Sequence, residues 1–237
     1  MRGIFNGSVM LLVIVFSVFG EDMIRGYFVG DCTIGSEVNN KTFDRYVDSL
    51  GTKYFMGGVR EVLRRGDFVV GNLETTIGEL GSPREKRFRF RGKAGYLDIL
   101  KDGGIGIVSI SNNHIYDYGE EGYEETCKNL DSAGISYYGF GHIKREMIKG
   151  KRFIFIGVTG FREDTTIYDR IREERGDYVV VSVHWGEESN YGVTEMQRRI
   201  GQRMIESGAG GDDRRSKITT IKYVGDSGYE QWEVFQG

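Results

Sequence analysis

Two of the three histidines in this 237-residue chain directly follow apolar segments. One lies in the sequence SNNHIYDYG at residues 111–119, and the other lies in VHWGE at residues 183–187. The preceding segments, residues 104–110 and 178–183, are short, rich in β-branched residues and bounded by Gly, Asp or Asn, which is typical of buried parallel strands. Because open α/β sheets bind ligands at the carboxyl ends of their strands, this placement predicts a functional site.

Two further apolar segments end in polar residues in the same way. Residues 27–30 run into Asp31, and residues 68–71 run into Asn72 and Glu74. The four predicted strand ends should therefore bring carboxylates, amides and imidazoles to one rim. Such a mixture suits divalent ions such as Mg, Mn, Zn or Fe, and so predicts a metal-centred hydrolytic site. The residues expected on the rim are Asp31, Asn72, Glu74, Asn113, His114 and His184.

The residue types suggest separate roles on this rim. We expect Asp31, Asn113 and His184 to bind metal, and His114 to protonate a leaving oxygen or contact an oxyanion, with Asp117 orienting it. Simpler interpretations stay open, because Asp31 also suits a turn and His114 also suits a hydrogen bond inside a loop. Glu187 faces either substrate or solvent. His142 is expected in a surface loop.

The four motifs, VGD at residues 29–31, GNLET at 71–75, SNNHIYDYG at 111–119 and VHWGE at 183–187, resemble in order those of the capsule synthesis protein CapA family. Its members are bacterial poly-γ-glutamate synthesis and export proteins of the calcineurin-like metallophosphoesterase superfamily. The resemblance covers roughly residues 24–209. It implies that Glu74, which would equally fit a cap, is a metal ligand or supports one.

The resemblance also implies a fold, a cofactor and partners. The expected α/β fold is a metallophosphoesterase sandwich in which two central sheets are flanked by helices. The cofactors are divalent metal ions, and the expected partners are an anionic polymer or a phosphate-ester substrate, and membrane subunits of capsule synthesis. Asn72, Arg89 and Glu187 are the candidates for substrate contacts.

The chain departs from the family after Gly208 and Ala209. The family continues into a Gly-His-x-Pro-His loop that supplies further metal ligands, whereas no histidine follows His184 here. We therefore expect an incomplete C-terminal part and reduced metal occupancy, because affinity depends on the number and type of ligands. Residues 210–237 form a divergent tail, expected to be poorly ordered, with edge strands at most near 218–224 and 231–235. A truncation, a frameshift or a genuine variant would each produce this break.

The remaining sequence predicts one main domain with an N-terminal leader. Arg2 precedes an apolar run at residues 8–19 that has the length of a signal-peptide core and is short for a membrane span, so residues 1–20 are a signal peptide or an anchor. A buried first strand or helix is the alternative for this segment.

The net charge of −3, with acidic and basic residues interspersed, argues against nucleic-acid binding. Cys32 and Cys127 are expected to be buried thiols without a disulfide.

Alternating strand and helix patterns favour a parallel sheet core. Helices are expected near residues 40–50, 59–65, 97–101, 120–133, 166–175 and 194–207.

The segment 84–93 alternates basic and aromatic residues with period two. This pattern predicts a strand that buries Phe88 and Phe90 and turns Arg87, Arg89 and Arg91 outward. That outer face is either simply solvated or a ridge that guides a polyanion.

Three functions follow from these observations. The first is an exported CapA-like protein that takes part in making or exporting an anionic capsule polymer, poly-γ-glutamate. The second is a metal-dependent phosphoesterase that acts on small phosphate esters or nucleotides. The third is a binding module that keeps the rim without turnover. Whether the chain is an enzyme therefore stays open at this point.

Overall fold

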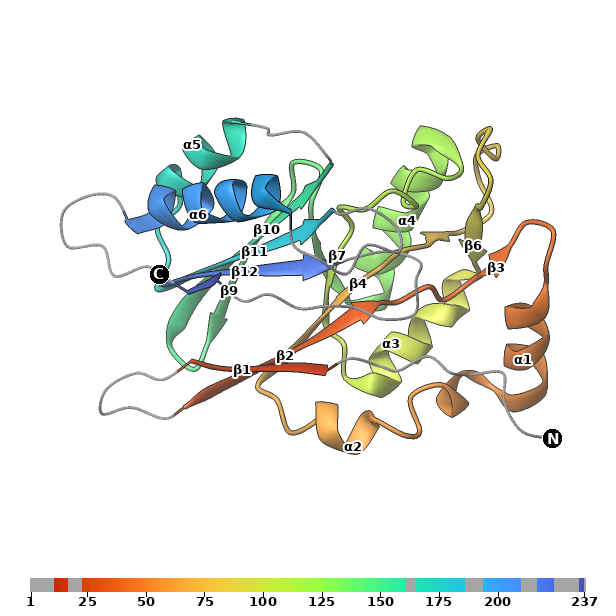
Figure 1. The fold of residues 1–237 in the computed structure, drawn as a ribbon. Helices are drawn as coiled ribbons and strands as arrows, with labels where there is room; N and C mark the ends of the chain where they lie inside the picture. Colours follow the sequence, from red (N-terminus) through yellow and green to blue (C-terminus); the bar gives the residue numbers. More distant parts are fainter. Residues whose placement is uncertain are drawn as a thin grey trace.

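Two five-stranded sheets form the centre of the protein (Figure 1). The computed structural model describes residues 11–16, 23–160, 165–185, 194–209, 217–223 and 235–236. The first sheet has the order β1-β2-β4-β7-β8, with strands Leu11–Phe16, Ile24–Asp31, Phe68–Asn72, Ile107–Ser109 and Ser136–Tyr138. The second has the order β13-β12-β11-β10-β9, with strands Phe235–Gln236, Lys217–Tyr223, Tyr178–His184, Lys151–Thr159 and Ile143–Ile148.

The inner strands of each sheet are parallel. In the first sheet β2, β4, β7 and β8 run in one direction, and in the second β10, β11 and β12 do. The strands β1, β9 and β13 are antiparallel to their neighbours. A small third sheet joins β3 (Ser36–Glu37), β6 (Phe90–Gly92) and β5 (Thr76–Ile77). The carboxyl ends of the parallel strands within each sheet therefore share one edge.

Helices cover the outer face of each sheet. On the first sheet side lie α1 (Thr42–Leu50), α2 (Arg60–Leu63), α3 (Leu97–Gly103) and α4 (Gly119–Ala133), with short 3₁₀ turns at Thr52–Tyr54 and Ala94–Tyr96. On the second lie α5 (Thr166–Glu173) and α6 (Glu195–Ala209). These helices match the six expected ones within a few residues. Gly134 ends α4 in the left-handed conformation, at φ 70°, that glycine adopts without steric cost.

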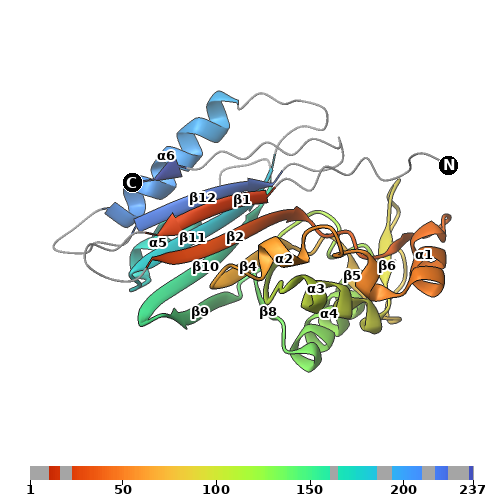
Figure 2. The same cartoon turned by 90° about the horizontal axis from the view of Figure 1, so that it is seen from below.

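The alternating direction of side chains along the strands explains how the sheets and helices pack as layers. In β10, Phe153 and Phe155 point into the core between the sheets, whereas Ile154 and Ile156 point toward α5 and α6. Both faces of such a strand are apolar, which is why these segments read as continuous hydrophobic runs. Figure 2 shows β1 and β2 lying across β10, β11 and β12. The expected α/β sandwich with two central sheets flanked by helices is confirmed.

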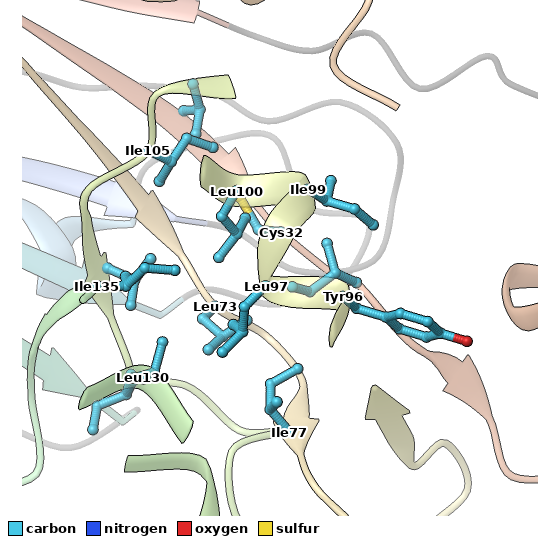
Figure 3. Close-up of a cluster of buried hydrophobic side chains, with 14 of the residues drawn as sticks. Cys32, Leu73, Ile77, Tyr96, Leu97, Ile99, Leu100, Ile105, Leu130 and Ile135 are labelled. Carbon is cyan, nitrogen blue, oxygen red and sulfur yellow. The ribbon is translucent and has the colours of Figure 1, made fainter. Parts of the chain in front are cut away.

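A third hydrophobic cluster anchors the helices of the first sheet. Figure 3 shows Leu97 and Leu100 of α3 and Leu130 of α4 gathered around Leu73, all fully or almost fully buried. Leu73 lies between Asn72 and Glu74, so packing of this one side chain helps to fix the backbone direction of two predicted site residues. The core and the rim are therefore built by the same short segment.

The strand predicted over residues 84–93 is wrong for most of its length. Only Phe90–Gly92 is a strand, and Phe88 is 40% exposed. Since β5 and β6 are parallel, the chain between them must travel back along the molecule, and residues 81–89 do so without a strand partner among the described residues. Arg91 also differs from the prediction, because its guanidinium lies 3.5 Å from the centre of the Tyr118 ring.

The N-terminal apolar run takes the alternative form of a first strand. Leu11–Phe16 is β1, which pairs antiparallel with β2 from Leu11 opposite Val29 to Phe16 opposite Ile24. The leader at residues 1–20 remains a prediction, and residues 1–10 and 17–22 lie outside the described residues. Within the described part of the chain, no helix combines the length and the apolar character needed to cross a membrane.

The C-terminal region forms two strands close to the two expected ones, but only β13 lies at the edge of the sheet. β12 pairs in parallel with β11 from Lys217 opposite Tyr178 to Tyr223 opposite His184, and β13 lies on its other side. β12 therefore occupies an interior position of the second sheet, between β11 and β13. Residues 210–216, 224–234 and 237 lie outside the described residues, so the prediction of a poorly ordered tail is not tested there.

The cysteines form no disulfide, as predicted. Cys32 is buried, whereas Cys127 in α4 is only partly buried. Burial nevertheless raises the pKa of the Cys127 thiol, so this residue stays protonated near neutral pH.

Candidate metal centre

Three potential ligands converge where the carboxyl edges of the two sheets meet. Asp31 ends β2, Glu74 follows β4, and His184 ends β11. One ligand atom from each lies within 4.8 Å of the other two. Asp31 and Glu74 come from the first sheet and His184 from the second, so the site depends on face-to-face packing of the sheets.

The donor set fits a divalent ion. Two ligand atoms on one metal lie at most about twice the bond length of ~2.1 Å apart, that is about 4.2 Å. The three ligand atoms here lie within 4.8 Å of one another, so a small inward shift of the side chains would let them share an ion. Glu74 Oε1 is 3.7 Å from His184 Nε2 and 3.9 Å from His114 Nε2, and all three side chains are buried. Two carboxylates and an imidazole suit Mn, Fe or Zn better than Ca, which prefers oxygen ligands alone.

Asn72 contacts this cluster from a fully buried position, at 0% exposure. Its predicted contact with substrate therefore stays a prediction. The amide nitrogen donates to Asp31 Oδ1 at 2.6 Å and lies 3.3 Å from His184 Nδ1, while the amide oxygen accepts from Asn112 Nδ2 at 3.0 Å. Asn72 is therefore placed to orient two of the candidate ligands.

Replacing Asn72 with leucine should destabilise the protein by about 1–3 kcal/mol, because Asp31 Oδ1 and Asn112 Nδ2 would both lose a buried partner. Chemical denaturation followed by circular dichroism measures this. Asn39→Leu is the matched control, since Asn39 is exposed and its side chain bonds only locally to Glu37; a change within about 0.5 kcal/mol is expected. Equal losses in the two variants would contradict the role of Asn72.

His114 and Asp117 form a second buried pair beside the cluster. His114 Nδ1 lies 2.7 Å from Asp117 Oδ2, which also accepts the backbone N–H of Phe90 at 2.8 Å. The Phe90 ring packs edge-on against the imidazole, with ring centres 4.8 Å apart. His114 Nε2 is thereby directed toward Glu74. This is the geometry in which a carboxylate fixes one ring nitrogen and leaves the other for chemistry.

Asn112 shapes the loop that carries His114, and sequence reasoning missed it. Its side-chain oxygen accepts the backbone N–H groups of His114 and Ile115 at 3.0 Å each, and its nitrogen donates to the Leu73 carbonyl at 2.8 Å. The available signal was the tendency of Asn to bond its own backbone two residues on. Lys86 was also missed; its ammonium lies 2.8 Å from Asp117 Oδ1.

Three further predicted site residues remain, of which the structure describes Asn113 and Arg89. Asn113 is exposed, and its backbone carbonyl accepts a bond from Lys86 at 2.7 Å, so its metal ligation stays a prediction. Arg89 is partly buried and donates to the Arg84 carbonyl at 3.2 Å. Glu187 lies outside the described residues. His142 is exposed in the turn between β8 and β9, as expected.

Comparison with known proteins agrees with the motif order. Residues 27–210 match the family described as "Bacterial capsule synthesis protein PGA_cap". The chain is 26% identical over 219 residues to the PGA biosynthesis protein CapA of Bacillus subtilis and 24% identical over 217 residues to the capsule biosynthesis protein CapA of Bacillus anthracis. These alignments cover 81% and 76% of this chain but 56% and 51% of the relatives, so the chain spans about half their length.

Two solved structures are more distant. A hypothetical protein from Thermus thermophilus has a TM-score of 0.47 at 19% identity, over 77% of this chain and 64% of that one. A novel phosphatase from Mycoplasma pneumoniae has a TM-score of 0.44 at 11% identity, over 79% of this chain and 60% of that one.

Proposed function

Because this chain belongs to the bacterial capsule synthesis protein family, we propose that it takes part in making or exporting an anionic capsule polymer such as poly-γ-glutamate. The proposal includes a divalent metal ion at the rim, a location outside the cytoplasm and an association with membrane subunits of capsule synthesis. The sequence similarity to two capsule proteins supports the polymer, and the rim geometry supports the metal.

The observation that carries the metal part is the convergence of Asp31, Glu74 and His184 from three strand ends. These residues would hold the ion, with Asn72 behind them fixing Asp31. When bound, such an ion polarises a carbonyl or phosphoryl oxygen. The two carboxylates also offset the charge of the cation in a buried place, where an uncompensated charge is costly.

The His114–Asp117 pair favours hydrolysis of a phosphate ester as a second function. His114 Nε2 is 3.9 Å from Glu74 Oε1, so the imidazole borders the proposed metal position. In that position it would deliver a proton to a leaving oxygen, while Asp117 keeps the ring oriented. The same pair would serve cleavage or transfer at the end of a polymer chain.

A capsule phenotype tests the first function. In the parent bacterium, deletion of the gene should lower the amount of cell-associated anionic polymer, and the intact gene should restore it. His184→Ala should fail to restore it, whereas His142→Ala, which alters an exposed loop histidine, should restore it fully. Normal polymer levels after deletion would contradict the capsule proposal. If deletion does lower the polymer level, comparison of His184→Ala with His142→Ala shows whether the rim is needed for polymer formation.

Export can be measured separately. A periplasmic-type reporter fused after Asp22 should be active outside the cytoplasmic membrane, because Arg2 and the apolar run at residues 8–19 have the pattern of a leader. Two charges placed within residues 11–15 should abolish that activity, since the core of a leader must be apolar. Two charges at exposed Asn39 and Asn40 of the full chain fused to the reporter are the control. A soluble cytoplasmic reporter in the unaltered fusion would contradict export.

A further inference from the structure

Lys86 reaches the buried His114–Asp117 pair from the irregular connection between β5 and β6. Its ammonium lies 2.7 Å from the carbonyl oxygen of Asn113, 2.8 Å from Asp117 Oδ1 and 3.1 Å from His114 Nδ1. The Lys86 side chain is 31% exposed, whereas that of Asp117 is 0% exposed. The lysine therefore meets a fully desolvated carboxylate with its charged end, which differs from an ordinary surface ion pair.

The bonds around Asp117 assign a role to each oxygen. Oδ2 accepts from His114 Nδ1 and from the Phe90 backbone, and Oδ1 accepts from Lys86. A ring nitrogen 2.7 Å from a carboxylate oxygen carries its proton toward that oxygen, so Nδ1 has no lone pair for Lys86. The donor bonds of Lys86 accordingly go to Asn113 and Asp117. They tie both ends of the short turn that carries His114.

Neighbouring cationic side chains in the same segment contact aromatic rings and not the His114–Asp117 pair. The guanidinium of Arg84 lies 5.6 Å from the centre of the Tyr116 ring, and that of Arg87 lies 4.9 Å from the centre of the Phe88 ring. Lys93 is exposed, with its ammonium 5.7 Å from the centre of the Tyr96 ring. A general electrostatic attraction of this basic segment to the acidic rim therefore does not account for the two hydrogen bonds that Lys86 donates.

We propose that Lys86 is a positioning residue for His114. It holds Asp117 and the Asn113 carbonyl in place, so that Asp117 fixes the imidazole with Nε2 directed toward Glu74 and the metal rim. The value of this positioning for turnover rests on the proposed function. The positioning itself is a property of the folded chain and can be observed without any reaction.

Nuclear magnetic resonance of the full chain with ¹⁵N-labelled histidine tests the positioning directly. The chain has only three histidines, and His114→Gln identifies the signals of that ring by their loss. In the unaltered protein the Nδ1 proton of His114 should give a downfield resonance, because it lies in a short bond to a carboxylate. Lys86→Ala should remove or broaden it, and ethylammonium added to that variant should restore it by filling the place of the lysine side chain. Lys93→Ala should leave it unchanged.

Circular dichroism must show that Lys86→Ala is folded under these conditions. An unchanged His114 resonance in the folded variant would overturn the proposal, as would a loss that ethylammonium does not reverse. The proposal is supported when the resonance is lost and then recovered.

Turnover gives the second readout, with Mn²⁺ and bis(p-nitrophenyl) phosphate as the probe. Lys86→Ala should lower kcat at least about tenfold with less than about a threefold change in KM, and ethylammonium should recover a measurable part of kcat. Lys93→Ala should keep full activity. If the unaltered chain does not hydrolyse the probe, the hydrolytic function fails, while the resonance still decides the role of Lys86. Hydrolysis that proceeds equally in Lys86→Ala would overturn the positioning role alone.

Discussion

Replacing His184 with alanine should lower the affinity of the full chain for Mn²⁺ at least about 100-fold, because the change deletes one of three converging ligands. Asp31→Asn should lower it as well. The asparagine oxygen can still accept the bond from Asn72 that Asp31 Oδ1 accepts at 2.6 Å, so this variant removes charge and keeps the local geometry. Titration calorimetry on chelator-treated protein measures the affinity, and elemental analysis measures the occupancy.

His142→Ala is the matched control for the metal experiment, since His142 is exposed in a turn and lies outside the group of converging ligands. Its affinity for Mn²⁺ should equal that of the unaltered chain. Because three ligands converge among the residues that the structure describes, we also expect fewer than two ions per chain. Unchanged uptake in both His184→Ala and Asp31→Asn would refute the assignment of ligands. Two tightly bound ions would refute the prediction of a reduced site.

The strand ends were predictable from the sequence because their signal is local. Apolar runs such as residues 178–183 fill both faces of a central strand, and the polar residues just after the run mark the rim. Asp31, Glu74 and His184 were located in this way, and the structure brings them together. The carboxyl ends of strands in one parallel sheet must share an edge. The family resemblance implied a fold with two central sheets, but only the structure shows that both sheets contribute to this group of ligands.

The contacts within the rim were less predictable because they depend on side-chain direction. Asn112 and Asn113 are adjacent and chemically identical, yet Asn112 is buried and Asn113 is exposed. In a loop no period fixes which of the two points inward; the backbone bonds from His114 and Ile115 to Asn112 decide it. Lys86 is a similar case, because its partner Asp117 lies 31 residues away in the chain.

The segment 84–93 shows why a period of two is insufficient evidence for a strand. Alternation predicts a strand only where a neighbouring backbone is present to accept its hydrogen bonds. Phe90–Gly92 finds such neighbours in β3 and β5, whereas residues 84–89 are outside any described strand. The N-terminal run shows that composition can leave two alternatives open. Leu11–Phe16 has the composition of a leader core and also pairs with β2 as a strand, so the leader at residues 1–20 remains a prediction.

The packing of the two sheets against each other should contribute strongly to stability, and Phe155→Ala tests this. Phe155 is fully buried between the sheets, where its ring centre lies 5.8 Å from that of Phe68 and 5.7 Å from that of Tyr138. Removing a buried aromatic ring loses its burial and leaves a cavity. We expect the free energy of unfolding to fall by about 3–5 kcal/mol. Urea denaturation monitored by circular dichroism measures the loss.

Phe88→Ala is the control of the same residue type, and it also tests the corrected strand. Phe88 is 40% exposed, so its truncation should change the free energy of unfolding by no more than about 0.5 kcal/mol. If Phe88 were buried, as its alternating pattern suggested, its truncation would instead lower the free energy of unfolding by several kcal/mol.

Because Phe68 belongs to the first sheet and Phe155 to the second, weakening their contact should also separate Asp31 from His184. Phe155→Ala should therefore weaken Mn²⁺ binding, whereas Phe88→Ala should not. If Phe155→Ala lowered the stability without lowering the affinity for Mn²⁺, the rim would not depend on this core.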